Sequence, residues 1–210
     1  MLKTDNVINI DDDFDKAIEE AGKIYFSGGV FIYPTDTIYG FGANPFNEEA
    51  VKKVSDIKER ESGKMYILLI RGIEDLLKYV DLKSEKHMDF LISIWPNPVS
   101  VILNLNKKTQ QLLNRENTAF RIPNHRFCLR LLSEIKMPLI STSVNRSNQT
   151  PLVEYSQIAN EFASEVDAVF YTDKKSYIES STIIDLSGLK PQLVREGKIK
   201  FDELMAKYEA

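Results

Sequence analysis

The segment from Phe31 to Gly42 constrains the fold more than any other part of the chain. It begins as an apolar, β-prone run and then meets Pro34, which has no backbone N–H and therefore ends a strand or places it at a sheet edge. Residues 35–37 follow as Thr-Asp-Thr on a tight turn, and the glycines at 40 and 42 allow positive φ angles or the close approach of another group. Such a turn after a strand is a common ligand-binding element of α/β sheets, although an ordinary turn held by Asx and Ser/Thr bonding explains the spacing equally well.

The remaining chain alternates between amphipathic helical patterns and short apolar runs. Helices are predicted over 11–26, 47–57, 74–79, 85–94, 125–132, 155–162 and 201–208. Strands are predicted over 30–33, 65–70, 99–105, 118–122, 137–140, 168–171, 183–186 and 191–194. Several strands follow loops rather than helices, which indicates an α/β fold with an open, twisted, mixed parallel and antiparallel sheet. Residues 107–117 predict a loop with a turn of helix, and Asn124 is a candidate helix cap.

Composition excludes several classes of protein. The longest apolar run, residues 65–70, is far too short to cross a bilayer, and the first residues lack an apolar signal region. Cys128 is the single cysteine, so neither an intrachain disulfide nor a multi-cysteine zinc site is available, and a cytoplasmic location is expected. A net charge of −4 argues against binding nucleic acid by bulk charge. No repeat or linker interrupts the 210 residues, so we expect a single domain over 1–210.

Four predicted strands end in small polar or basic segments, at 34–37, 118–121, 141–145 and 180–182. A basic cluster, Lys58, Arg60 and Lys64, follows the helix that ends near residue 57. Each feature taken alone fits solvent-exposed loops and cations at a helix C-terminus. Together they would suit a polyanion and a small zwitterion. His125 is a candidate general base, but a cap or surface role fits it better, and His87 has a weaker claim.

In this order the motifs resemble the threonylcarbamoyl-AMP synthases of the YrdC/TsaC family. The resemblance runs from about residue 28 to 197 and rests on the segments Pro34–Gly40, Lys58–Arg60, Arg121–His125, Ser143–Asn145, Ser181–Asp185 and Arg195–Gly197. The lysine-x-arginine and serine-x-asparagine pair distinguishes the synthases from YciO-like relatives. Glu61, Asn97 and Asn148 depart from the family, which has a proline at the first position and glycines at the other two.

The resemblance implies a YrdC-like sheet with a concave ligand cleft, and a nucleotidyltransferase reaction. L-threonine, bicarbonate and ATP, with Mg²⁺ accompanying ATP and no tightly bound cofactor or protein metal site, would give threonylcarbamoyl-AMP and pyrophosphate for a downstream tRNA-modifying complex. The residues that it implies for ATP are Lys58 and Arg60, both also catalytic, Lys64, Thr118, Ser143, Asn145 and Arg195. Those for threonine are Thr37, Arg121, Ser141 and Ser181, with Arg121 pairing with the carboxylate. Asp36 would brace its turn or lie near the threonine amine or Mg²⁺.

Two alternatives remain. A cleft lined by polar residues could belong to an RNA-binding or YciO-like module without threonine-dependent ATP turnover. The chain lacks the interleaved basic and aromatic residues that are typical of RNA-binding proteins, which weighs against RNA binding. A relative that transfers carbamoyl groups to another acceptor would be indifferent to threonine.

Overall fold

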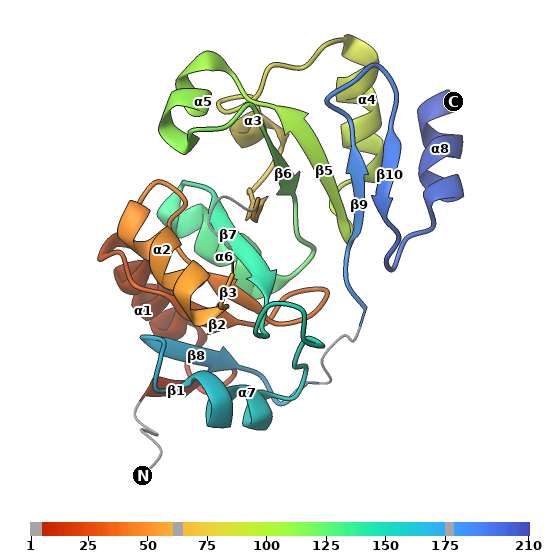
Figure 1. Cartoon of the computed structure of the whole chain (residues 1–210). Helices are drawn as coiled ribbons and strands as arrows, with labels where there is room; N and C mark the ends of the chain where they lie inside the picture. Colours follow the sequence, from red (N-terminus) through yellow and green to blue (C-terminus); the bar gives the residue numbers. More distant parts are fainter. Residues whose placement is uncertain (1–5, 61–64, 175–178) are drawn as a thin grey trace.

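The computed structural model describes residues 6–60, 65–174 and 179–210, and these contain one ten-stranded sheet (Figure 1). Its strand order is β1-β8-β2-β3-β7-β4-β6-β5-β9-β10. The strands are β1 (Val7–Asn9), β2 (Phe31–Tyr33), β3 (Gly40–Gly42), β4 (Ile67–Leu69), β5 (Val99–Asn104), β6 (Asn117–Arg121), β7 (Leu139–Ser143), β8 (Ala168–Tyr171), β9 (Thr182–Asp185) and β10 (Gln192–Arg195). Parallel and antiparallel pairs both occur, which confirms the mixed α/β sheet.

Eight helices pack on this sheet in the described part of the chain. They are α1 (Phe14–Phe26), α2 (Glu48–Ile57), α3 (Ile73–Leu76), α4 (Glu85–Ile94), α5 (Lys107–Leu113), α6 (Arg126–Ile135), α7 (Tyr155–Phe162) and α8 (Phe201–Glu209). The side chain of Asn47 caps α2 by accepting from the Ala50 N–H at 3.0 Å, and Glu48 and Glu49 lie in the first turn, where they suit the positive end of the helix dipole. None of these helices is both long and apolar enough to span a membrane.

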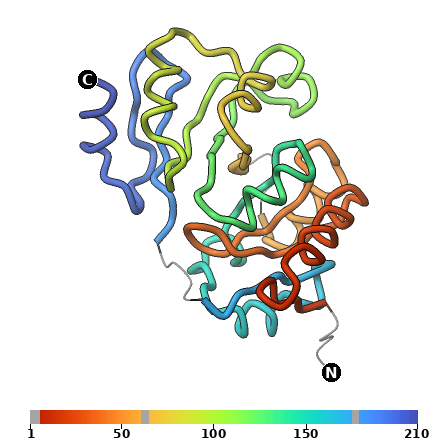
Figure 2. The backbone as a smooth tube through the Cα atoms, turned by 180° about the vertical axis from the view of Figure 1, so that it is seen from behind, coloured from red at the N-terminus to blue at the C-terminus, as the bar shows by residue number. Residues whose placement is uncertain are grey.

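The sheet separates two apolar cores that differ in extent. The first core contains side chains of α2, α3, α4, α7 and α8 and of strands from both halves of the sheet. The second contains α1 and α6 with buried residues of β2, β4, β7 and β8 only. Figure 1 shows α2 in front of the sheet, and Figure 2 shows α1 and α6 on the opposite side. On the second face, therefore, the described residues of β5, β6, β9 and β10 carry no buried apolar layer.

Three local features differ from the sequence prediction. Residues 141–143, predicted as a polar loop, continue strand β7, where Ser141 pairs with Ile67 and Ser143 with Gly40. The glycines at 40 and 42 form β3 without positive φ, so their role is close approach: a Cβ on Gly42 would lie 2.7 Å from the Phe31 ring. The cap prediction for Asn124 is wrong, because α6 starts at Arg126 and the backbone N–H of Asn124 instead donates to Asp36 Oδ2 at 3.1 Å.

Candidate functional site

The turn after β2 and the end of β6 meet in a buried polar cluster. Arg121 NH1 donates to Thr37 Oγ1 at 2.9 Å, and Arg121 NH2 lies 3.2 Å from Asp36 Oδ1. Thr35 Oγ1 lies 2.9 Å from Thr37 Oγ1 and donates to the Ile38 carbonyl at 2.8 Å, which fixes the turn. Asp36 therefore braces this turn by pairing with Arg121 and accepting from Asn124. Only 3 % of Arg121 is exposed, so a full guanidinium charge is held inside the protein.

One donor of this guanidinium has no partner among the described residues. Arg121 Nε is buried and makes no hydrogen bond there, and neither does Asp36 Oδ1, which lies 3.2 Å from Arg121 NH2 as an ion pair without hydrogen-bond geometry. A buried charged donor without an acceptor is costly and is uncommon in folded proteins. The cluster thus contains a buried N–H that lacks an acceptor, and a carboxylate is a suitable acceptor for it.

Side chains of β5, β7 and β10, and that of Ser181 just before β9, lie on the same face of the sheet as Arg121. Arg121 pairs across the ladder with Leu69 of the second core, and Ser141 pairs with Ile67 next to it. Side chains alternate between the two faces along a strand. Strand residues next to a first-core position therefore point to the same face as Arg121. Ser181 Oγ lies 2.9 Å from the buried Ser100 Oγ, and Arg195 NH2 donates to the Ser181 carbonyl at 2.9 Å. Burial, followed by the charge of Arg121, lowers the pKa of Arg195.

Gly197 allows this arrangement at the end of β10. A Cβ at this position would lie 2.3 Å from the Ser180 carbonyl oxygen and 2.7 Å from that of Ser181. The Thr182 hydroxyl accepts from the Gly197 N–H at 3.0 Å and donates to the Ile199 carbonyl. The glycine of the arginine-x-glycine motif therefore lets the two backbone segments touch, which positions Arg195 beside Ser181.

Lys58 joins the end of α2 to the end of β7. Its ammonium donates to the Ser143 carbonyl at 2.5 Å, to the Asn145 carbonyl at 2.9 Å and to Asn145 Oδ1 at 2.9 Å. Ser143 Oγ donates to the same Asn145 Oδ1 at 2.7 Å. Burial and the neighbouring Arg60 charge lower the pKa of Lys58 to about 7. All three donors of Lys58 thus hold the serine-x-asparagine segment, and its predicted contact with phosphates stays a prediction.

Asn97 and Asn148, two of the residues that depart from the family pattern, fit their positions. Asn148 adopts a φ of 66°, a left-handed conformation that glycine favours and asparagine tolerates. Asn97 Nδ2 donates to the Ile94 carbonyl at 2.9 Å at the end of α4. Glu61 and Lys64 lie outside the described residues.

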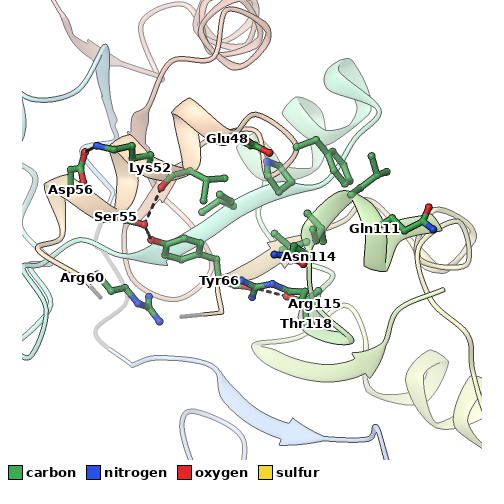
Figure 3. A pocket seen from close by; sticks show the side chains of 17 residues that line it. Glu48, Lys52, Ser55, Asp56, Arg60, Tyr66, Gln111, Asn114, Arg115 and Thr118 are labelled. Carbon is green, nitrogen blue, oxygen red and sulfur yellow. Dashed lines mark hydrogen bonds and ion pairs between the residues drawn. The ribbon is translucent and has the colours of Figure 1, made fainter. Parts of the chain in front are cut away.

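Arg60 and Thr118 lie away from the Arg121 cluster. Both line a cavity of about 720 Å³ between α2 and the α5 region (Figure 3). Thr118 is three residues before Arg121 on β6, so the two side chains point to opposite faces of the sheet, and the Thr118 hydroxyl donates to the Tyr66 carbonyl at 3.3 Å. The resemblance implies that Thr118 and Arg195 share one ATP site, and the structure places their side chains on different faces of the sheet. Their contact with ATP stays a prediction.

Three further residues follow from the structure. Ser100 was not singled out from the sequence, although a serine inside the apolar run of residues 99–105 was a usable signal. His125 is half-buried at the start of α6, where burial lowers the pKa of its imidazole, and it makes no side-chain cap bond. His87 is buried with Nε2 3.2 Å from the Leu189 carbonyl, which indicates a structural role.

The comparison with known families identifies the fold. The model of the family Sua5_yciO_yrdC, described as "Telomere recombination", matches residues 23–197. The chain belongs to the Sua5/YciO/YrdC family. Its match spans the Thr37–Arg121 cluster, the Lys58 bridge and the Arg195–Gly197 turn, so all three lie within the family domain.

Solved structures of this family share the fold. A crystal structure of P. abyssi Sua5 complexed with L-threonine aligns with a TM-score of 0.86 and 24 % identity over 96 % of this chain and 60 % of the P. abyssi chain. E. coli YciO aligns with a TM-score of 0.82 and 24 % identity over 92 % of this chain and 95 % of YciO. MTH1692 from Methanobacterium thermoautotrophicum aligns with a TM-score of 0.65 and 28 % identity over 88 % of each chain. This chain thus spans about six tenths of the P. abyssi Sua5 chain.

Proposed function

We propose that this protein is an L-threonylcarbamoyladenylate synthase. It would convert L-threonine, bicarbonate and ATP to threonylcarbamoyl-AMP and pyrophosphate, and a tRNA-modifying complex would use the product. Family membership and the threonine complex of P. abyssi Sua5 support this proposal at the level of the fold. Two residue clusters of this chain support it at the level of chemistry.

The observation that carries the proposal is the unused Nε–H of the buried Arg121. A guanidinium already held by Asp36 and Thr37 is oriented in advance, so binding a carboxylate loses little side-chain entropy. The hydroxyls of Thr37, Ser141 and Ser181 are polar groups that suit the amine and hydroxyl of threonine. A small zwitterion with a hydroxyl group fits this set better than an extended polymer does.

The nucleotide would bind beside threonine on the same face. Arg195, next to Ser181, places a second guanidinium near Arg121, which suits a phosphate. Ser143 and Asn145, ordered by Lys58, would contact the nucleotide, and Lys64 would contact its phosphates. Arg60 lines the cavity on the other face, so it would contact the phosphates only if they reached that side. Thr118 would join this site only if the ligand reached the cavity side of the sheet.

Mg²⁺ would enter with ATP and offset negative charge on its phosphates. No group of three or more His, Cys, Asp and Glu side chains in the described ranges has the geometry of a metal site. We therefore expect the ATP phosphates and water, with at most one carboxylate such as Asp36, to hold the ion.

The chemistry requires no protein nucleophile. The threonine amine adds to CO₂ derived from bicarbonate and loses a proton, giving a carbamate. A carbamate oxygen attacks the α-phosphorus of ATP, the bond from the α-phosphorus to the β-bridging oxygen breaks, and pyrophosphate leaves. The protein's task is to align these groups and to stabilise the charge on the phosphates, a role that we assign to Arg195 on this face.

Pyrophosphate release that depends on both threonine and bicarbonate tests the proposal. The purified chain should release pyrophosphate from ATP only when both are present, and mass spectrometry should detect threonylcarbamoyl-AMP. Turnover without threonine, with ammonia and bicarbonate supplying the carbamate and carbamoyl-AMP as product, would contradict the proposal and favour a carbamoyl-transferring relative. Salt-dependent RNA binding without any turnover would favour the RNA-binding alternative.

A further inference from the structure

The large cavity on the face opposite Arg121 has the features of a second ligand site. Its volume of about 720 Å³ lies in the range typical of small-molecule sites, roughly 300–1,000 Å³. Phe46, Leu68, Leu113 and Ile140 supply apolar lining, and Gln111 and Asn114 add amide groups at the α5 end. None of Arg121, Ser141, Ser181 and Arg195 lines this cavity, so it is separate from the proposed threonine site.

Two arginines give this cavity its charge. Arg60 lies with its guanidinium carbon 4.8 Å from the centre of the Tyr66 ring and donates to the Met65 carbonyl at 3.1 Å. Arg115 is half-buried, and neither arginine has an ion-pair partner among the residues that the structure describes. Burial lowers the pKa of Arg60, and the charge of Arg115 lowers it further, so the two cations repel one another across the cavity.

The acidic residues of the lining do not neutralise this pair. Asp56 is held by Lys52 at 2.6 Å, within α2. Figure 3 shows Glu48 at the end of the cavity away from Arg60, with Arg60 and Arg115 on either side of Tyr66. The Tyr66 ring is itself anchored, since its hydroxyl lies 2.7 Å from Ser55 Oγ. An anchored aromatic ring between two guanidiniums presents a flat apolar surface flanked by two sets of phosphate donors.

We propose that this cavity binds a phosphate monoester that carries a flat apolar body. The phosphate lies beside the edge of the Tyr66 ring, where Arg60 and Arg115 approach it from either side with bidentate donors and its negative charge offsets their mutual repulsion. The body packs against Tyr66 and Phe46, and the amides of Gln111 and Asn114 meet its polar edge. The proposal does not depend on the function of the Arg121 face.

A nitrogen-15 NMR titration of the full chain with phenyl phosphate tests this site. Phenyl phosphate should shift the backbone amides of residues 48–56 and 111–118 in a saturable manner. It should bind more tightly than inorganic phosphate, which lacks the ring. Arg115→Gln should weaken binding by roughly tenfold or more, as expected for losing a charged hydrogen bond, and Arg115→Lys should give an intermediate loss.

Arg130→Gln provides the matched control. Arg130 is an exposed arginine of α6 in an ion pair with Glu134 at 3.1 Å, so its loss should leave phenyl phosphate binding unchanged. Shifts confined to residues 36–37, 121 and 181 would overturn the proposal, and so would wild-type affinity in Arg115→Gln. The spectrum of each variant also reports whether it is folded, and threonine-dependent turnover can be measured on the same samples to test the Arg121 face separately.

Discussion

The two halves of the sheet use the same face in opposite ways. Where α1 and α6 cover it, this face presents Phe31, Leu69 and Leu139 to a buried apolar core. Across β5, β6 and the ends of β9 and β10, it presents Ser100, Arg121, Ser181 and Arg195 instead. Burying one large apolar side chain is worth about 1.5–3 kcal/mol, yet this half of the face buries polar side chains: Ser100, Arg121 and Ser181 are at most 3 % exposed.

The change occurs within single strands. On β7 the side chains at 139, 141 and 143 point the same way, and they change from leucine to two serines. On the pair β4–β6, apolar Leu69 lies directly opposite charged Arg121. Serine and arginine thus occupy positions on the same face as the second apolar core, where packing alone would favour apolar side chains. A ligand explains these polar residues better than packing does. The following predictions test this difference between the halves, from the largest expected effect to the smallest.

Replacing Arg121 should have the largest effect. Arg121→Gln removes the carboxylate donor and leaves the buried Asp36 carboxylate without its cation. Threonine-dependent pyrophosphate release should fall roughly 10²–10³-fold, and unfolding free energy should drop by about 3–5 kcal/mol. Arg71→Gln, which breaks a partly exposed ion pair with Asp75, should cost at most about 1 kcal/mol and leave turnover intact. Equal behaviour of the two variants would refute the special role of Arg121.

Gly197→Ala tests the turn that places Arg195. The added Cβ would lie 2.3 Å from a backbone oxygen that cannot rotate away, so we expect a loss of about 1–3 kcal/mol in stability and a higher KM for ATP. Gly188→Ala is the control, because a Cβ there meets nothing within 4 Å. Thermal melts and ATP titrations of both variants measure the difference. A Gly197→Ala protein with normal affinity for ATP would show that Arg195 does not hold the nucleotide.

The lowered pKa of Lys58 predicts a pH dependence of ATP binding. Lys58 loses its proton as pH rises through about 7, and a bound polyphosphate favours the protonated form. The Kd for ATP should therefore increase above pH 7, by up to about tenfold per pH unit. Lys58→Met should bind more weakly at low pH and lose this dependence, and subtracting its profile removes the titration of ATP itself. If the Kd for ATP changed with pH in the same way in the Lys58→Met variant and in the unchanged protein, Lys58 would be excluded as the titrating group.

Ser100→Ala should have the smallest effect. It removes the hydroxyl partner of Ser181 and should raise the KM for threonine several-fold, with a stability change of about 1 kcal/mol. Ser133→Ala, which removes a hydroxyl bonded to the Leu129 carbonyl in α6, lies on the covered half and should leave KM unchanged. Steady-state kinetics and thermal melts of both variants measure these effects. An unchanged KM for threonine in Ser100→Ala would show that Ser181 does not bind threonine.

Sequence patterns predicted most of the fold because the elements have clear local signals. Asn47 before two glutamates starts α2, and Pro34 ends β2. Strand β7 was predicted to end at residue 140 because Ser-Thr-Ser looks like a loop, and the ladder bonds to β3 and β4 are non-local. Strand β1 was missed since its three residues pair only with β8, far away in the chain.

The site was predicted in part. Motif order indicated Thr37, Arg121 and the Lys58–Asn145 pair, and the structure brings each of these sets together. The spacing of Thr118 and Arg121 already placed them on opposite faces of one strand, a consequence of period two that the sequence prediction did not apply. The cavity at Arg115 had no local signal, because it joins residues 45–68 to residues 111–118.

A crystal structure with L-threonine and a non-hydrolysable ATP analogue tests the central claim most directly. We expect both ligands on the Arg121 face, with the threonine carboxylate on Arg121 Nε and the phosphates near Arg195. Density for the nucleotide in the cavity lined by Arg60 and Thr118, with Arg121 Nε still without a ligand, would contradict it.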